Sequence, residues 1–180
     1  LLGGTSMYAQ SWRGGGPVTL DKKYAGYHCV NLLDSTSVTV EPTGQGSFAV
    51  CRAVQVQTPV GALQQRVLKY DYDPLTAAAV FKRVTIYHSD GTYTPVDVSK
   101  TCDYAAPARA IYWGARQIML ELGQLEPGDI IDYEIDKKGF TYALLGDMPQ
   151  EGDDSRFIPP MRGQFYDIVP FWSSDPTLRK

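Results

Sequence analysis

The amino-acid sequence predicts an all-β protein, a large and mostly antiparallel β-sandwich, and three observations support this fold class. Apolar and polar residues alternate with the two-residue period of a strand in several separate segments. Clusters of glycine, proline, aspartate and serine separate these segments, as turns do. Aromatic residues make up 12% of the chain, most of them tyrosine, and such residues favour half-buried pleated surfaces. Many short strands joined by turns are typical of a sandwich.

The strands are expected in order along the chain after an N-terminal arm or linker, which spans residues 1–23 and contains a glycine-rich stretch. Alternating or apolar segments predict strands at 24–33, 37–41, 47–57, 64–72, 80–88 and 92–98. Residues 42–46 and Asp90-Gly91 are turn signals that predict two hairpins. Residues 105–113 fit a helix or a strand end equally well. Short strands are also predicted at 140–145 and 163–172.

The most distinctive stretch spans residues 118–135 and predicts a long antiparallel hairpin at the middle of the protein. Ile118, Leu120 and Leu122 alternate with Met119, Glu121 and Gly123, and Pro127-Gly128 fits a type II turn. In the second strand one face is expected to carry Ile131, Tyr133 and Ile135, and the other Ile130, Asp132 and Glu134. The stretch contains no nucleophile and no histidine, so its role is architectural.

The composition is that of an ordinary globular protein, with 180 residues, 21% charged and a net charge of −3. The negative balance argues against nucleic acid or an anionic membrane as the main partner. The sequence lacks a run of about 20 apolar residues, so no membrane span is predicted. The first residues, LLGGTSMYAQSW, fit either the remnant of a signal peptide or a linker from a longer chain. We expect one domain over residues 24–180, and we expect the natural polypeptide to continue past Lys180.

The reactive side chains do not form a recognisable catalytic set. The cysteines, Cys29, Cys51 and Cys102, are odd in number and lack CxxC spacing, so each is predicted to be a small buried hydrophobe. His28 would point away from Cys29 in a strand, while a pairing of His88 with Cys51 or Cys102 stays open. Structural histidines are the preferred interpretation. No catalytic residue and no cofactor is therefore predicted.

Two groups of carboxylates suggest alternatives. The acidic loop at 146–160 offers weak calcium candidates, Asp147, Glu151, Asp153 and Asp154, but their spacing does not match an EF-hand, and a solvated loop is preferred. Asp132 and Glu134 share a strand face and could resemble the paired carboxylates of glycosidases. Exposed strand carboxylates are the simpler interpretation, and no metal site is predicted.

The aromatic run FYDIVPFW provides the interface candidates Phe165, Tyr166, Phe171 and Trp172. They would suit a carbohydrate or peptide platform, but core filling together with docking against a following domain is preferred, because large apolar surfaces normally mark interfaces.

The order of several motifs resembles the domain family DUF3857. The motifs are LLDSTSVTVEPTGQGSFAVCRAVQVQTPVG, LKYDYDP, VFKRVTIYHSDGTYTPV, LGQLEPGDIIDYEID and FYDIVPFWSSDP, and together they cover the chain from about residue 24 to its end. The resemblance implies a β-sandwich similar in shape to the N-terminal domain of M1 aminopeptidases. It also implies a place before a transglutaminase-like cysteine protease domain, in secreted or periplasmic proteins of Bacteroides-type bacteria. The catalytic Cys-His-Asp set of such proteins belongs to the following domain, so the resemblance transfers no site residue.

These observations predict a non-catalytic accessory or scaffold domain that positions or screens the catalytic domain of a larger transglutaminase-like protein. Its expected partner is the downstream domain of the same polypeptide. The alternative is an independent module that binds peptide or glycan.

Overall fold

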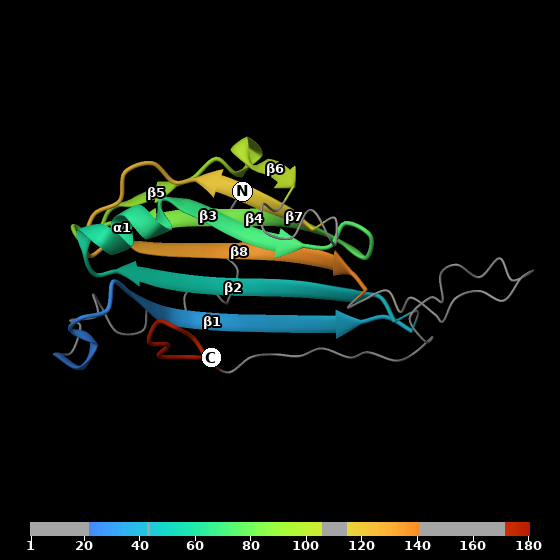
Figure 1. Cartoon of the computed structure of the whole chain (residues 1–180), viewed down its shortest axis with the longest axis horizontal. Coiled ribbons are helices and arrows are strands. Elements are labelled where there is room, and N and C mark those ends of the chain that lie inside the picture. The colour runs from blue at the N-terminus through green and yellow to red at the C-terminus, as the bar shows by residue number, and fades with distance from the viewer. Residues whose placement is uncertain (1–21, 43, 106–114, 141–171) are drawn as a thin grey trace, which may run out of the picture.

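The computed structural model describes residues 22–42, 44–105, 115–140 and 172–180, which form two antiparallel β-sheets (Figure 1). The larger sheet has five strands in the order β1-β2-β8-β4-β5, and the smaller has three in the order β3-β7-β6. The larger sheet consists of β1 (Cys29–Val40), β2 (Gly46–Val56), β8 (Ile130–Gly139), β4 (Ala77–Tyr87) and β5 (Tyr93–Pro95). The smaller consists of β3 (Val67–Tyr72), β7 (Arg116–Glu121) and β6 (Cys102–Ala105). The predicted all-β, mostly antiparallel class is confirmed.

Among the described residues, short helical elements accompany the strands: the α-helix α1 (Pro59–Gln65) and the 3-10 helices η2 (Lys22–Tyr24) and η3 (Val98–Lys100). Thr58 is the N-cap of α1, and its hydroxyl accepts a hydrogen bond from the amide of Gly61 at 3.1 Å. Pro59 occupies the first turn, where its missing amide costs no hydrogen bond. The predicted strand at 64–72 is therefore wrong over its first residues, which belong to α1 and its C-cap.

Both predicted hairpins are confirmed. β1 and β2 pair through a turn in which the amide of Glu41 donates to the carbonyl of Gln45 at 2.8 Å. The β4–β5 turn contains Gly91 at φ 88°, a conformation that glycine adopts without steric cost. The Asp90 carboxylate accepts hydrogen bonds from the amide and hydroxyl of Thr92 and fixes this turn.

The predicted long hairpin over 118–135 is wrong, although its turn exists. The amide of Asp129 donates to the carbonyl of Glu126 at 3.1 Å, and Gly128 has φ 101°. However, β7 pairs with β3 and β6, whereas β8 pairs with β2 and β4. Residues 122–129 thus carry the chain from one sheet to the other. The alternation of apolar residues fixed which face each strand buries, but not which strand lies beside it.

Other strand boundaries also differ from the prediction. The two strands expected at 24–33 and 37–41 are one strand, β1, with a bulge between Asn31 and Leu33, and residues 24–28 before it are not strand. The return strand at 92–98 is shortened to β5, because Asp97 caps η3 through the amide of Ser99. β6 was not predicted at all. The elements expected at 106–113, 141–145 and 163–171 lie outside the described residues.

The main core lies between the two sheets. β8 is central in the larger sheet, and its face with Ile131, Tyr133 and Ile135 packs into the same cluster as Ile118 and Leu120 of β7. In Figure 1 the smaller sheet lies toward the β4–β8 side of the larger one, and α1 lies near one end of the strands. The predicted division of β8 into two faces is confirmed, since Ile130 belongs to a separate cluster with residues of β1 and β2.

Candidate functional site

The carboxylates of Asp132 and Glu134 are buried, with relative exposures of 2% and 5%, so their interpretation as exposed strand carboxylates is wrong. Arg83 of β4 binds Asp132 with two nitrogens, at 2.8 and 3.3 Å. Lys82 binds Glu134 at 2.8 Å and Asp136 at 3.4 Å. A bulge in β4 between Phe81 and Arg83 brings both basic residues beside β8.

The electrostatics of this ion-pair layer favour a structural role over glycosidase-like chemistry. The hydrogen bond to Glu134 and its charge raise the pKa of Lys82. Burial lowers the pKa of Arg83, but the hydrogen bonds and charge of Asp132 outweigh it and the net shift is upward. A glycosidase needs one carboxyl kept protonated as an acid and one left ionised. Here each carboxylate is instead bound to a basic side chain of β4, an arrangement that joins two strands.

The two buried cysteines, Cys29 and Cys51, lie in environments that do not activate a thiol. Cys29 and Cys51 are buried as predicted, and burial is the main cause that raises the pKa of each thiol. The negative charge of Glu134 adds to the shift at Cys51. Cys102 is exposed on β6, so its predicted burial is wrong. A reactive cysteine needs a lowered pKa, whereas the two buried thiols have the opposite shift.

Both histidines have polar partners, in agreement with structural roles. His88 Nδ1 lies 3.1 Å from Asp129 Oδ1, and Nε2 lies 2.9 Å from Thr94 Oγ1. Asp129 is 3% exposed and also accepts the amide of Glu126 at 2.9 Å. The order hydroxyl, imidazole, carboxylate resembles that of a hydrolase triad. Asp129 also fixes the turn before β8. We therefore interpret the hydrogen bonds among Thr94, His88 and Asp129 as structural contacts that hold β4, β5 and β8 together. His28 binds the N-cap residue Thr58 at 2.8 Å.

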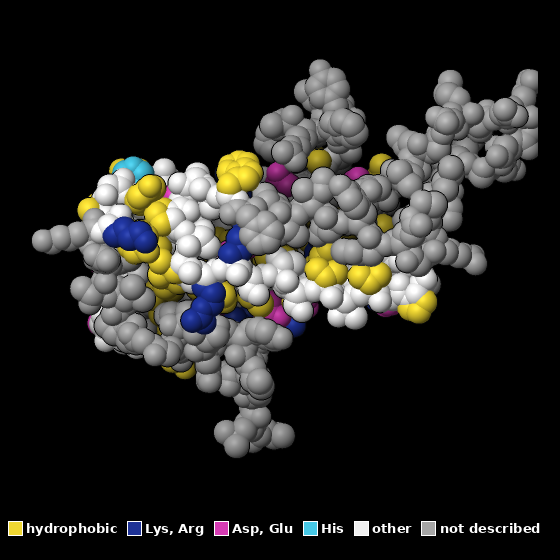
Figure 2. All heavy atoms as spheres, turned by 90° about the horizontal axis from the view of Figure 1, so that it is seen from below, with side chains coloured by type: hydrophobic (Ala, Val, Ile, Leu, Met, Phe, Trp, Pro, Cys, Tyr) yellow, Lys and Arg dark blue, Asp and Glu magenta, His cyan; other side chains and the backbone are white. Residues whose placement is uncertain are grey.

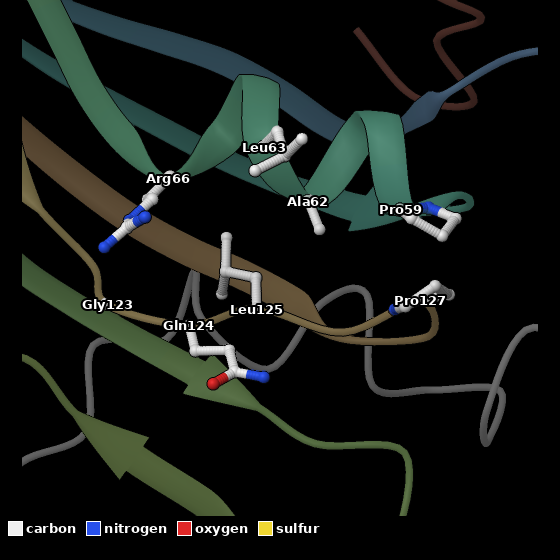
Figure 3. A pocket seen from close by; sticks show the side chains of 8 residues that line it. All are labelled: Pro59, Ala62, Leu63, Arg66, Gly123, Gln124, Leu125 and Pro127. Carbon is white, nitrogen blue, oxygen red and sulfur yellow. The ribbon is translucent and has the colours of Figure 1, made fainter.

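A groove of about 430 Å³ lies between α1 and the segment that leads from β7 to β8 (Figure 3). The side chains of Ala62 and Leu125 lie across from each other, Arg66 lies toward one end, and Pro59 and Pro127 toward the other (Figure 3). Leu63 is 72% exposed at the groove. The lining of this groove is mostly apolar, and Arg66 is its one charged side chain among the described residues.

Sequence reasoning missed this groove because it placed a strand over part of α1 and a hairpin over the opposite wall. One signal was present: Thr58-Pro59 is a threonine N-cap followed by proline in the first turn, which marks a helix start. No pattern in the sequence predicts that α1 lies beside residues 123–127 in the folded protein.

A second cleft, of about 350 Å³, lies where the C-terminal segment meets the larger sheet. Its lining includes Arg52, Asp34 and Tyr133, with Trp172 at 81% exposure. Residues 176–179 run beside β1: Asn31 donates its amide to Pro176 at 2.8 Å, and Asp34 donates its amide to Arg179 at 2.9 Å. The segment after Trp172 is therefore held against the edge strand of the larger sheet.

Of the calcium and interface candidates named from the sequence, only Trp172 falls within the described part of the chain. The calcium candidates Asp147, Glu151, Asp153 and Asp154 and the interface candidates Phe165, Tyr166 and Phe171 lie outside it. Within the described ranges, no group of three or more His, Cys, Asp or Glu side chains could hold a metal ion. No described helix has the length and apolar character needed to cross a bilayer. Basic side chains lie at separate places on the face seen in Figure 2, rather than in one patch.

Comparison with known proteins gives a family and a fold. DUF3857, described as a domain of unknown function, matches residues 42–180. No curated protein matches the chain. The crystal structure of a "putative protease" from Parabacteroides distasonis ATCC 8503 is similar, with a TM-score of 0.54 and 12% sequence identity. The similarity covers 62% of this chain and 23% of that one, so the matched part of this chain spans about a quarter of the larger structure.

Proposed function

The chain belongs to the DUF3857 family, and from this premise we propose that it is a non-catalytic accessory domain of a larger transglutaminase-like protein. In this role it positions or screens the catalytic domain of the same polypeptide. A location in the periplasm or outside the cell is part of the proposal. The observation that carries it is the occurrence of a similar fold over 23% of a longer chain that is named a "putative protease".

The use of the polar side chains supports the non-catalytic part of the proposal. Within the described residues, Asp132, Glu134 and His88 each bind a partner from another strand or turn. Such pairs fix the register between strands and hold the sheet together. These ionisable groups therefore join neighbouring strands and turns, which suits a domain that positions another.

Trp172 supports the docking part of the proposal. At 81% exposure it is the most exposed large hydrophobic side chain among the described residues. Trp172 lies just before residues 176–179, which backbone hydrogen bonds hold against β1. The position of Trp172 along the chain is therefore close to a segment that is fixed on the sheet. Covering an aromatic side chain removes roughly 150–250 Å² from water, at about 25 cal/mol per Å². A following domain that covers Trp172 would thus gain several kcal/mol by that estimate, before the entropy cost of ordering.

The exposure of Trp172 also distinguishes a role in the core of this domain from a role in docking against a following domain, two roles that the sequence did not separate. Truncation of an exposed side chain changes the stability of the isolated chain by less than about 0.5 kcal/mol. In the parent polypeptide, truncation of a docked tryptophan costs roughly 2–4 kcal/mol. We therefore expect Trp172→Ala to lower the stability of the parent polypeptide, which contains the catalytic domain, and to leave the stability of the isolated chain nearly unchanged.

Denaturant unfolding of the isolated chain and of the parent polypeptide, each as wild type and as Trp172→Ala, tests this expectation. Leu75→Ala is the matched control, because Leu75 is 79% exposed in the β3–β4 turn. The control should leave both unfolding midpoints unchanged. Equal effects of Trp172→Ala in the two contexts, or a parent gene without a Cys-His-Asp domain, would overturn the proposal.

A further inference from the structure

We propose that the groove between α1 and residues 123–127 binds an extended peptide that carries a carboxylate next to Arg66. This site goes beyond the accessory role and does not depend on it, because the groove lies on different elements from the C-terminal segment. The proposal rests on three observations: unpaired backbone groups, an apolar floor and a basic side chain at one end.

The first observation is the backbone of Gly123, Gln124 and Leu125. Among the described residues, none of the three makes a backbone hydrogen bond. The stretch is nevertheless fixed at both ends, since the amide of Leu122 donates to the carbonyl of Arg66 at 2.9 Å and the amide of Glu126 donates to Asp129. A fixed stretch with free amides and carbonyls can pair with an added strand, which is how many domains bind extended peptides.

The second observation is the apolar floor and rim of the groove. Ala62 and Leu125 are buried and line it, while Leu63 on the rim is 72% exposed. A volume of about 430 Å³ admits side chains of a short peptide rather than a folded domain. An apolar side chain that enters the groove would cover the exposed part of Leu63, which gains free energy in proportion to the area removed from water.

The third observation gives the charge of the ligand. Arg66 Nη2 lies 3.4 Å from Glu121 Oε1, and the two side chains are 55% and 67% exposed. An exposed ion pair of this kind contributes little to stability. A guanidinium has five donors, so a ligand carboxylate can bind Arg66 with two parallel hydrogen bonds and displace or join Glu121. The groove therefore favours an acidic peptide over a basic one.

Fluorescence polarisation with two short fluorescein-labelled probes tests the proposal on the whole chain. Both probes alternate threonine and valine; one ends in glutamate and the other in lysine amide. The wild type should bind the glutamate probe more tightly. Arg66→Glu should reverse the preference and lower the affinity for the glutamate probe about tenfold, as loss of a charge-assisted pair does. Because Arg66 is largely exposed, the variant should fold normally.

Lys69→Glu is the matched control, since it makes the same charge change at an exposed position of β3. It should leave the preference unchanged. A third probe, with N-methylated backbone amides, should bind weakly, and amide signals of residues 123–125 should shift in NMR spectra when the glutamate probe is added. The proposal falls if the wild type binds neither probe up to about 1 mM, if Arg66→Glu and Lys69→Glu act alike, or if N-methylation has no effect.

Discussion

Replacement of Asp132 by alanine tests how much the buried ion-pair layer contributes to stability. The Asp132 side chain is 2% exposed and receives two hydrogen bonds from Arg83, which is itself 30% exposed. Loss of one partner of a buried pair typically costs about 3–5 kcal/mol, because the other charge is left without compensation. Since water reaches part of Arg83, we expect Asp132→Ala to lower the free energy of unfolding by roughly 2–4 kcal/mol.

Glu134→Ala provides the comparison within the same layer. Its partner Lys82 is 53% exposed and can return to water when the carboxylate is removed. The loss should therefore be smaller, about 1–2 kcal/mol. A double variant that replaces both members of the first pair, Arg83→Met with Asp132→Leu, should recover most of the stability lost in Asp132→Ala, because no buried charge remains unpaired.

Urea unfolding followed by circular dichroism gives the free energies, and a constant m-value shows that only stability has changed. The reasoning fails if Asp132→Ala costs no more than Glu134→Ala. It also fails if the double variant is less stable than Asp132→Ala. In that case the packing of Arg83 and Asp132, rather than the pairing of their charges, would account for their contribution to stability.

Two further predictions follow from packing and burial. A Cβ on Gly61 would overlap the carbonyl oxygen of His28 and lie 3.0 Å from the Cys29 sulfur, so Gly61→Ala should destabilise the protein by about 1–2 kcal/mol, although alanine favours helices. Gln64→Ala on the exposed face of α1 is the control. If thermal melts show Gly61→Ala to be more stable than the wild type, the close packing of Gly61 against His28 and Cys29 would be contradicted. Burial raises the pKa of Cys29 and Cys51 above the ordinary value of 9.0, so the folded state keeps these protons longer than the unfolded state, and stability should fall as the pH rises above that value. Ellman's reagent should label Cys102 in the native protein and the two buried thiols only after unfolding, whereas rapid labelling of all three in folded protein would refute their burial.

The faces of the strands could be predicted from the sequence, but their neighbours could not. The two-residue period assigned Ile131, Tyr133 and Ile135 to one buried face correctly, because successive side chains of a strand point in opposite directions. The same pattern suggested that residues 118–122 and 129–135 pair with each other, which the structure does not show. Consecutive strands often pair, so the expectation was reasonable. In this protein the segment at 122–129 instead changes sheets.

The groove was less accessible to sequence reasoning than the sheets. A helix of seven residues is too short to show a clear 3.6-residue period, so only its cap signals it. In the opposite wall, residues 123–125 make no backbone hydrogen bond to the described part of the chain. No residue type in a sequence marks such an amide. A site built from such features becomes visible only when the two walls are seen side by side (Figure 3).

The buried carboxylates of β8 show why an alternating strand can mislead. Polar residues at every second position normally mark a face in water, and Asp132 and Glu134 fit that pattern. Their cationic partners, however, lie 49 and 52 residues earlier in the chain, on β4. Only the register between β4 and β8, together with the bulge that adds one residue to β4, brings Lys82 and Arg83 within reach of both carboxylates. A shift of that register by one residue would move the basic side chains to the opposite face of the sheet and leave two charges buried without partners. The ion-pair layer therefore specifies the pairing of the two strands as well as stabilising it.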